Sequence, residues 1–254
     1  MKETLIIEKK TPKKLKKGIL ITGLPGIGLV GQVVGRYLVE ELKAEKIANL
    51  ISPHFPHQVF MTKKGGMRII KNSFYIHRGK KRDMLILVGD IQAMSSVGQY
   101  EVTGAILEYC EKLGVIELLT VGGYSTGQIS EERRIFGVAT SDAMRVKLKK
   151  QGVVFGAAKG SIVGAAGLIP ALGKIKGVEG GCVMGETHGS YVDTASARQI
   201  VLMLSRYLDM KIDLKRLDEK AKESQKMLKQ VQAEVQKTME QQFDQSSRNV
   251  SYIR

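Results

Sequence analysis

Short apolar runs alternate with longer amphipathic stretches between residues 18 and 209. The runs at 18–23, 84–89 and 115–121 have apolar residues at nearly every position, which is typical of strands buried on both faces of a sheet. Helix-like periodicity follows the first two runs. This alternation predicts a three-layer α/β/α fold with a largely parallel sheet. We also expect strands at 46–51, 135–140 and 181–186, a hairpin at 58–77, and helices at 30–42, 96–113, 142–150, 161–173 and 194–209, the last capped by Asp193 or Thr194.

The chain changes character after residue 209. Residues 213–243 contain neither glycine nor proline, and their apolar residues follow a heptad-like spacing. This pattern predicts a long polar helix over 210–244 that either self-associates or packs against its own domain. Its apolar stripe consists of Leu214, Leu217, Ala221, Leu228, Val231 and Val235. We therefore divide the chain into a basic N-terminal arm or edge strand (1–17), an α/β/α domain (18–209), the long helix (210–244) and a flexible tail with an apolar terminus (245–254).

The positive charge is concentrated in two segments. The chain has 40 Lys and Arg against 25 Asp and Glu, a net charge of +15. Residues 1–17 carry +5, 63–82 carry +8 and 210–254 carry +3; subtracting these from the total leaves −1 for the rest. Residues 63–82 also contain Phe74 and Tyr75, so a basic hairpin that follows a phosphate backbone is one hypothesis. Protection of an exposed sheet edge is the alternative that we favour.

A nucleotide site is a second hypothesis. Gly26, Gly28 and Gly31 form a G-x-G-x-x-G pattern between a strand and a helix, where backbone N–H groups can face a pyrophosphate. Asp90 follows another strand at its carboxyl end, where α/β folds place ligand-binding groups. The dinucleotide pattern also requires an acidic residue about 20 positions later, and residues 50–54 supply none. Tight packing of strand against helix therefore explains the glycines better, and a local cap or turn explains Asp90 better.

Hydrolase and metal chemistry have weaker signals. Gly123-Tyr-Ser-Thr-Gly127 matches the G-x-S-x-G elbow, and Asp142 or Glu186 with His188 follow in the hydrolase order. The elbow requires a helix directly after its serine, and only the short segment 128–133 separates the motif from the next expected strand. The histidines at 54 and 57 are bracketed by prolines, so we expect no metal site. Cys110 and Cys182 are expected to be buried thiols.

Several segments together resemble the proteasome-assembly-chaperone family, most closely its archaeal members. They are residues 23–31 (GLPGIGLVG), 89–92 (GDIQ), 122–127 (GGYSTG) and 160–168 (GSIVGAAGL), and they occur in the family's order over about 15–209. Residues 186–189 (ETHG) and the long helix also fit. The resemblance implies a fold similar to that of purine nucleoside phosphorylases, with no established catalytic activity and no cofactor. It also implies self-association and ATP-independent binding of proteasome α-subunits or the α-ring.

The resemblance also gives the C-terminus a role. In proteasome activators and chaperones of this kind, the chain closes on a hydrophobic residue, a tyrosine and any residue, and its terminal carboxylate enters pockets between α-subunits. Here the last residues are Tyr252, Ile253 and Arg254, so isoleucine stands where the pattern has tyrosine. A tail that instead binds a second, partner chaperone or its own oligomer is an equal alternative. The absence of a long apolar run or leader predicts a cytoplasmic protein without a membrane partner. A small-ligand enzyme at the glycine loops and a nucleic-acid-binding protein remain the alternatives.

Overall fold

The computed structural model describes residues 1–128, 132–158 and 160–222. In chain order its elements are β1 (Leu5–Glu8), β2 (Gly18–Gly23), the 3-10 turn η1 (Ile27–Leu29), α1 (Val30–Glu41), β3 (Glu45–Ile51), β4 (Val59–Met61), β5 (Met67–Ile69), β6 (Asn72–His77), β7 (Met84–Gly89), α2 (Ser96–Leu113), β8 (Val115–Ser125), β9 (Ile135–Ala139), α3 (Asp142–Lys149), α4 (Ala165–Ile175), β10 (Glu179–Thr187) and α5 (Thr194–Tyr207). A further helix begins at Lys215 and reaches residue 222, the last described residue.

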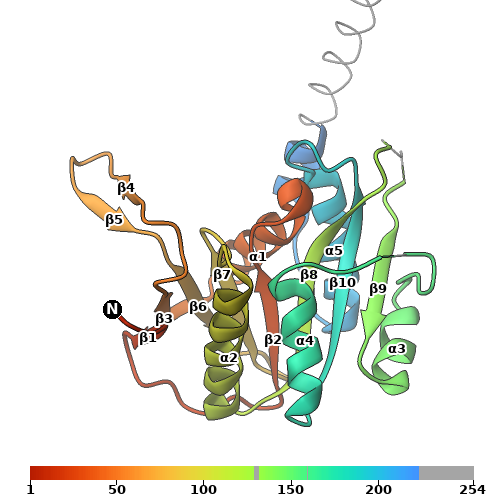
Figure 1. Ribbon diagram of the computed structural model, residues 1–254. Coiled ribbons are helices and arrows are strands. Elements are labelled where there is room, and N and C mark those ends of the chain that lie inside the picture. The colour runs from red at the N-terminus through yellow and green to blue at the C-terminus, as the bar shows by residue number, and fades with distance from the viewer. Residues whose placement is uncertain (129–131, 159, 223–254) are drawn as a thin grey trace, which may run out of the picture.

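Eight strands form one sheet in the order β1-β3-β6-β7-β2-β8-β10-β9. The central strands β7, β2, β8 and β10 are parallel, whereas the outer strands pair antiparallel. The sheet is thus more mixed than we expected, because β6 reaches β7 through a short turn, and such a turn joins only antiparallel strands. The predicted α/β fold is confirmed: α2 and α4 cover one face, and α1 and α5 cover the other (Figure 1).

Consecutive residues of the central strands enter two separate cores. On β2, Leu20 packs beneath α2 and α4, while Ile21 packs beneath α1 and α5. Both side chains are fully buried, and burying a side chain of this size stabilises a fold by about 1.5–3 kcal/mol. An apolar residue is therefore needed at each position of these strands, which is why the sequence shows continuous runs rather than alternation.

The helix starts agree with the capping rules. The Ser95 hydroxyl accepts a hydrogen bond from the Gly98 N–H at the start of α2, and Ser141 caps α3 in the same way. Asp193 caps α5 by accepting from the Ser196 N–H at 2.9 Å. α4 begins at residue 165 rather than the expected 161.

The expected hairpin at 58–77 is shorter in the structure. β4 and β5 form a two-stranded hairpin that projects from the domain, whereas β6 lies in the main sheet between β3 and β7 (Figure 1). The reason is burial: Phe74 on β6 is completely buried beneath α2 and lies 4.8 Å from the Tyr109 ring. The hairpin itself keeps Met61 and Met67 largely exposed.

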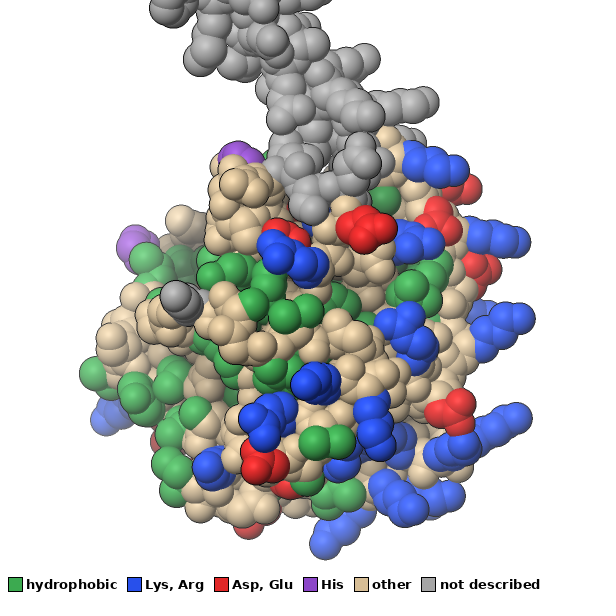
Figure 2. All heavy atoms as spheres, turned by 90° about the vertical axis from the view of Figure 1, so that its right-hand side faces the viewer, with side chains coloured by type: hydrophobic (Ala, Val, Ile, Leu, Met, Phe, Trp, Pro, Cys, Tyr) green, Lys and Arg blue, Asp and Glu red, His purple; other side chains and the backbone are tan. Residues whose placement is uncertain are grey.

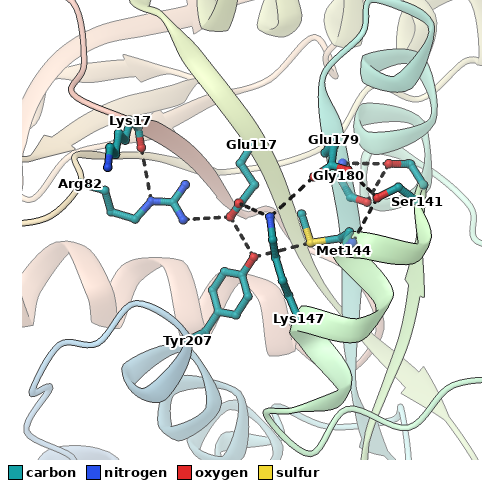
Figure 3. Close-up of polar contacts among 10 residues, drawn as sticks. Lys17, Arg82, Glu117, Ser141, Met144, Lys147, Glu179, Gly180 and Tyr207 are labelled. Carbon is teal, nitrogen blue, oxygen red and sulfur yellow. Dashed lines mark hydrogen bonds and ion pairs between the residues drawn. The ribbon is translucent and has the colours of Figure 1, made fainter.

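Charged groups meet near the amino ends of the central strands (Figure 3). Glu117, close to the start of β8, accepts hydrogen bonds from Arg82 at 3.0 Å and from the Tyr207 hydroxyl at 2.9 Å. Lys147 of α3 lies 3.7 Å from Glu117 and 3.6 Å from Glu179. Burial and the Glu117 carboxylate raise the pKa of Tyr207. We call these five residues the Glu117 cluster; it joins α3, α5 and the β6–β7 turn to the sheet.

Candidate functional site

The glycine-rich segments meet at the carboxyl edge of the parallel strands. Gln92 links two of them directly: its Nε2 donates to the Pro25 carbonyl at 2.6 Å, and its Oε1 accepts from the Ala165 N–H at 2.9 Å. Ser125 joins the third segment to β10, because its hydroxyl donates to the His188 carbonyl at 2.8 Å. Segments separated by up to 140 residues thus build one edge of the sheet.

The glycines of the G-x-G-x-x-G pattern allow close packing at this edge. A Cβ at Gly31 would lie 2.5 Å from the Val121 carbonyl oxygen, and one at Gly28 would lie 2.7 Å from Thr187 Oγ1. Gly28 also has a φ of 61°, which favours glycine. The start of α1 therefore approaches β8 and β10 too closely for any side chain, which accounts for both residues through packing alone. A Cβ at Gly26 would meet only Gln92 Nε2, at 4.0 Å, and Gly26 lines a cavity.

That cavity has a volume of about 520 Å³, and we call it the glycine-edge cavity. Its lining is mainly apolar, and its described residues include no charged side chain. The polar side chain of Gln92 is already engaged in the contacts above. Apolar side chains gather on the left of the face seen in Figure 2, and the exposed Val163 and Val138 belong to the cavity lining. The described lining therefore suits an apolar group, and none of its described side chains offers a charge to a pyrophosphate.

Asp90 lies away from this cavity. Its carboxylate accepts hydrogen bonds from the Arg68 guanidinium of β5 and from the Lys71 N–H at 3.2 Å. It lines a different cavity, on the α1 face of the sheet. The structure therefore does not bring Asp90 together with Gly26, Gly28 and Gly31, and Asp90 anchors the base of the β4–β5 hairpin as a local acceptor.

The hydrolase residues are not assembled. Ser125 contacts the backbone of His188, whose ring Nδ1 lies 3.1 Å from the Ser190 hydroxyl. Glu186 is held by Arg134 through contacts of 2.8 and 2.9 Å, and this guanidinium lowers the pKa of Glu186. Asp142 is exposed at the start of α3. Within the described residues after Ser125, the chain does not form the helix that an elbow requires.

The structure describes no metal site among residues 1–128, 132–158 and 160–222. The His54 ring instead contacts the Glu101 carboxylate at 2.7 Å. Both cysteines are buried free thiols, and burial raises the pKa of Cys182 to about 11. Over the same ranges, none of the helices combines the length and apolar character needed to span a bilayer.

The basic segment 63–82 is divided between two places. Lys63 and Lys64 lie at the turn of the projecting hairpin, whereas Arg78 and Arg82 lie at the far end of β6. There Arg78 pairs with Asp83 at 2.6 Å, and Arg82 belongs to the Glu117 cluster. The segment is therefore not one continuous surface for a phosphate backbone.

The start of the C-terminal helix packs against its own domain. Leu217 is 1% exposed and Ala221 is 8% exposed, and Leu214 packs against the same core. Arg216 pairs with Glu41 of α1 at 2.8 Å. Leu214, Leu217 and Ala221 of the apolar stripe thus pack against their own domain, which is the second of the two alternatives predicted for this helix. Leu228, Val231 and Val235, together with Tyr252, Ile253 and Arg254, lie outside the described residues.

Sequence reasoning missed two connections. Arg133 and Asp193 form a buried ion pair at 3.3 Å, with side chains 3% and 1% exposed. Nothing local in the sequence joins residues 60 positions apart. Gln92 could be noticed in the sequence because it is the last residue of the segment 89–92. Its hydrogen-bond partners could not be predicted, because only the folded topology brings them next to it.

Comparison with known proteins identifies the family of the chain. The family model described as the PAC2 family matches residues 20–232. The chain belongs to the PAC2 family. It is 33% identical over 222 residues to an uncharacterized protein of Methanocaldococcus jannaschii, covering 87% of this chain and 86% of that one.

Several solved structures are similar to this PAC2-family chain, among them two archaeal proteins. Pyrococcus furiosus PbaB, an archaeal proteasome activator, is 37% identical with a TM-score of 0.86, covering 91% of this chain and 100% of PbaB. Pyrococcus furiosus PbaA, an archaeal homolog of proteasome-assembly chaperone, is 22% identical with a TM-score of 0.76, covering 99% of this chain and 100% of PbaA. PbaA thus supports the fold, while PbaB also has substantial sequence similarity.

Proposed function

We propose that the protein is a non-enzymatic, ATP-independent proteasome assembly chaperone or activator that binds α-subunits or the α-ring. The observation that carries this proposal is the similarity to PbaB, an archaeal proteasome activator, over the whole of that chain. The site chemistry supports it: the glycine-edge cavity is apolar in its described lining, and the hydrolase residues lie apart. These features suit a protein that works through binding surfaces.

The proposal includes a role for the C-terminus. The helix that begins at Lys215 is attached to the domain at its start: the Tyr37 hydroxyl donates to the Asp213 carbonyl at 2.6 Å, and Thr194 donates to the Lys220 carbonyl at 3.2 Å. These two bonds hold residues 213–220 against α1 and α5. Self-association through Leu228, Val231 and Val235 would then present several tails together, which raises avidity by about 10²–10⁴ where the geometry permits joint binding.

A binding assay tests the partner and the tail. Isolated archaeal α-rings are immobilised, and the full chain is compared with a chain that ends at Asn249. We expect the full chain to bind and the shortened chain to lose most of that binding. The Arg254→Ala variant is the matched control, because the last position accepts any residue and binding should persist. Equal binding by full and shortened chains removes the tail from the mechanism, and no binding by either contradicts the partner.

Light scattering after size exclusion tests the self-association. Leu228→Glu should shift the protein to a smaller species, whereas the neighbouring change Lys229→Glu, outside the stripe, should leave its mass unchanged. A monomeric wild-type chain, or an unchanged mass for Leu228→Glu, contradicts the proposed oligomer.

A further inference from the structure

A second cavity, of about 460 Å³, lies on the α1 face of the sheet. Its walls come from α1, from β3, β6 and β7, and from the base of the β4–β5 hairpin. We call it the basic cavity because four cationic side chains line it against two acidic ones. The cations are Arg36, Lys46, Arg68 and Lys71, and the acids are Glu40 and Asp90.

Both acids have arginine partners. Asp90 accepts from Arg68 and from the backbone of Lys71. Glu40 lies 3.3 Å from Arg216, which comes from the C-terminal helix and does not line the cavity. Among the residues that the structure describes, the remaining three cations have no carboxylate within ion-pair distance; they are Arg36, Lys46 and Lys71.

Lys46 is the cation of this cavity whose pKa responds to burial and to its charged neighbours. It is half-buried on β3, opposite Tyr75 of β6, and its Nζ lies 5.8 Å from the centre of the Tyr75 ring. Burial lowers the pKa of Lys46, and the positive charges of Lys71 and Lys9 lower it further. Asp90 acts on Lys46 in the opposite direction, but positive charges outnumber negative ones around it and repel one another. An anion in the cavity would relieve this repulsion.

We propose that the basic cavity binds a multiply charged phosphate group, either free or carried by a small phosphorylated ligand. The lining carries four positive and two negative side chains, a net charge of +2, which matches an anion with two or more negative charges better than a single carboxylate. An arginine supplies paired N–H donors and the lysines supply point charges, a combination suited to phosphate oxygens. The volume lies within the range of roughly 300–1,000 Å³ that small-ligand sites occupy.

Calorimetric titration of the full chain with inorganic pyrophosphate at low salt tests this site. We expect saturable binding that weakens at least tenfold in Lys46→Gln and in Lys71→Gln. Arg36→Gln should act in the same direction, and its exposed position on α1 makes it safe for folding. Lys63→Gln is the matched control: it removes one positive charge from the exposed hairpin turn, outside the cavity, and should change the affinity less than twofold.

Three results overturn the proposal: no binding at millimolar pyrophosphate, an equal loss in Lys63→Gln, or equal affinity for citrate, a polycarboxylate. A parallel titration with ADP distinguishes the sources of the phosphate. Tighter binding of ADP than of pyrophosphate indicates a phosphorylated ligand whose organic part also makes contacts, and the reverse order indicates a free polyphosphate. Because these titrations use no proteasome component, their outcome is independent of α-ring binding.

Discussion

Two charged clusters lie toward opposite ends of the same sheet, and they differ in one respect. In the Glu117 cluster, near the amino end of β8, the cations Arg82 and Lys147 each have a carboxylate partner. In the basic cavity, on the α1 face of the sheet beside the carboxyl end of β7, Arg36, Lys46 and Lys71 have none among the described residues. The first cluster is complete within the chain, whereas the second has an excess of one sign.

The difference separates a structural cluster from a candidate ligand site. The carboxylate of Glu117 is only 10% exposed, so removing its charge leaves its partners without compensation. The cations of the basic cavity repel one another, so removing one of them costs the fold little. Mutations that remove a single charge should therefore have opposite consequences at the two ends of the sheet, and this contrast can be measured.

The largest effect is expected at Glu117. Glu117→Gln should lower the free energy of unfolding by about 3 kcal/mol, because it breaks a largely buried ion pair and leaves Arg82 uncompensated. Urea denaturation measures the change. The control is Glu111→Gln, whose exposed carboxylate lies 3.5 Å from Lys176, and which should change stability by less than about 0.5 kcal/mol. A change in the free energy of unfolding as small as that of Glu111→Gln would show that the Glu117 cluster stabilises the fold no more than a surface ion pair does.

The next effect concerns the pH dependence of anion binding. Because the pKa of Lys46 is lowered from 10.5, this side chain loses its proton at a lower pH than an exposed lysine does. Sulfate keeps its charge at alkaline pH, so its affinity for the basic cavity should fall about tenfold, or about 1.4 kcal/mol, as pH rises toward 10.5. The charged groups that act on Lys46 are Lys71, Lys9, Asp90 and Arg68.

Calorimetry across this pH range provides the measurement, with Lys46→Gln as the reference. The variant should bind sulfate weakly at every pH and show a shallower alkaline decline. An equally steep decline in the variant would assign the titration to another group and contradict the role of Lys46.

Arg134 and Glu186 form an intermediate case, with one buried and one exposed partner. The Glu186 side chain is 2% exposed and that of Arg134 is 59% exposed. The guanidinium lowers the pKa of Glu186 below 4.5, so its stabilisation is present above pH 4.5 and is lost as pH falls through the lowered pKa. Arg134→Gln should lower the melting temperature at neutral pH, because Glu186 loses its charged partner, and this loss should shrink in acid.

Thermal melts of Arg134→Gln at several pH values follow this change. Arg145→Gln, which removes an exposed partner of the exposed Asp142, is the control and should show a smaller cost without the acid dependence. A cost for Arg134→Gln that stays constant down to acid pH would mean that Glu186 is not the group responsible.

The sequence predicts the central part of the fold well. The apolar runs on β2, β7 and β8 are continuous because both faces of these strands are covered, and the N-cap at Asp193 is visible from the residue type alone. The range predicted for the hairpin, 58–77, is too long, because the local sequence pattern does not show that Phe74 is buried in the main sheet. The predicted roles of Tyr252, Ile253 and Arg254 stay predictions.

The two cavities differ in how far they could be predicted. The glycine-edge cavity is built from segments that the sequence marks, although the packing of Gly28 and Gly31 replaces the nucleotide role that their spacing suggests. No sequence motif predicts the basic cavity. Arg36 comes from α1, Lys46 from β3 and Lys71 from the start of β6, and only the strand order brings them together.

The smallest effect is expected for the stability of Lys46→Gln without any anion. Relief of repulsion among the cations should leave the free energy of unfolding unchanged or raise it by up to about 0.5 kcal/mol. Urea denaturation under the conditions used for Glu117→Gln makes the two values comparable, and Lys63→Gln again serves as the control. A clear loss of stability in Lys46→Gln would mean that Lys46 stabilises the fold through its own contacts, as Glu117 does. The two ends of the sheet would then both be structural, and the charge excess would no longer identify a ligand site.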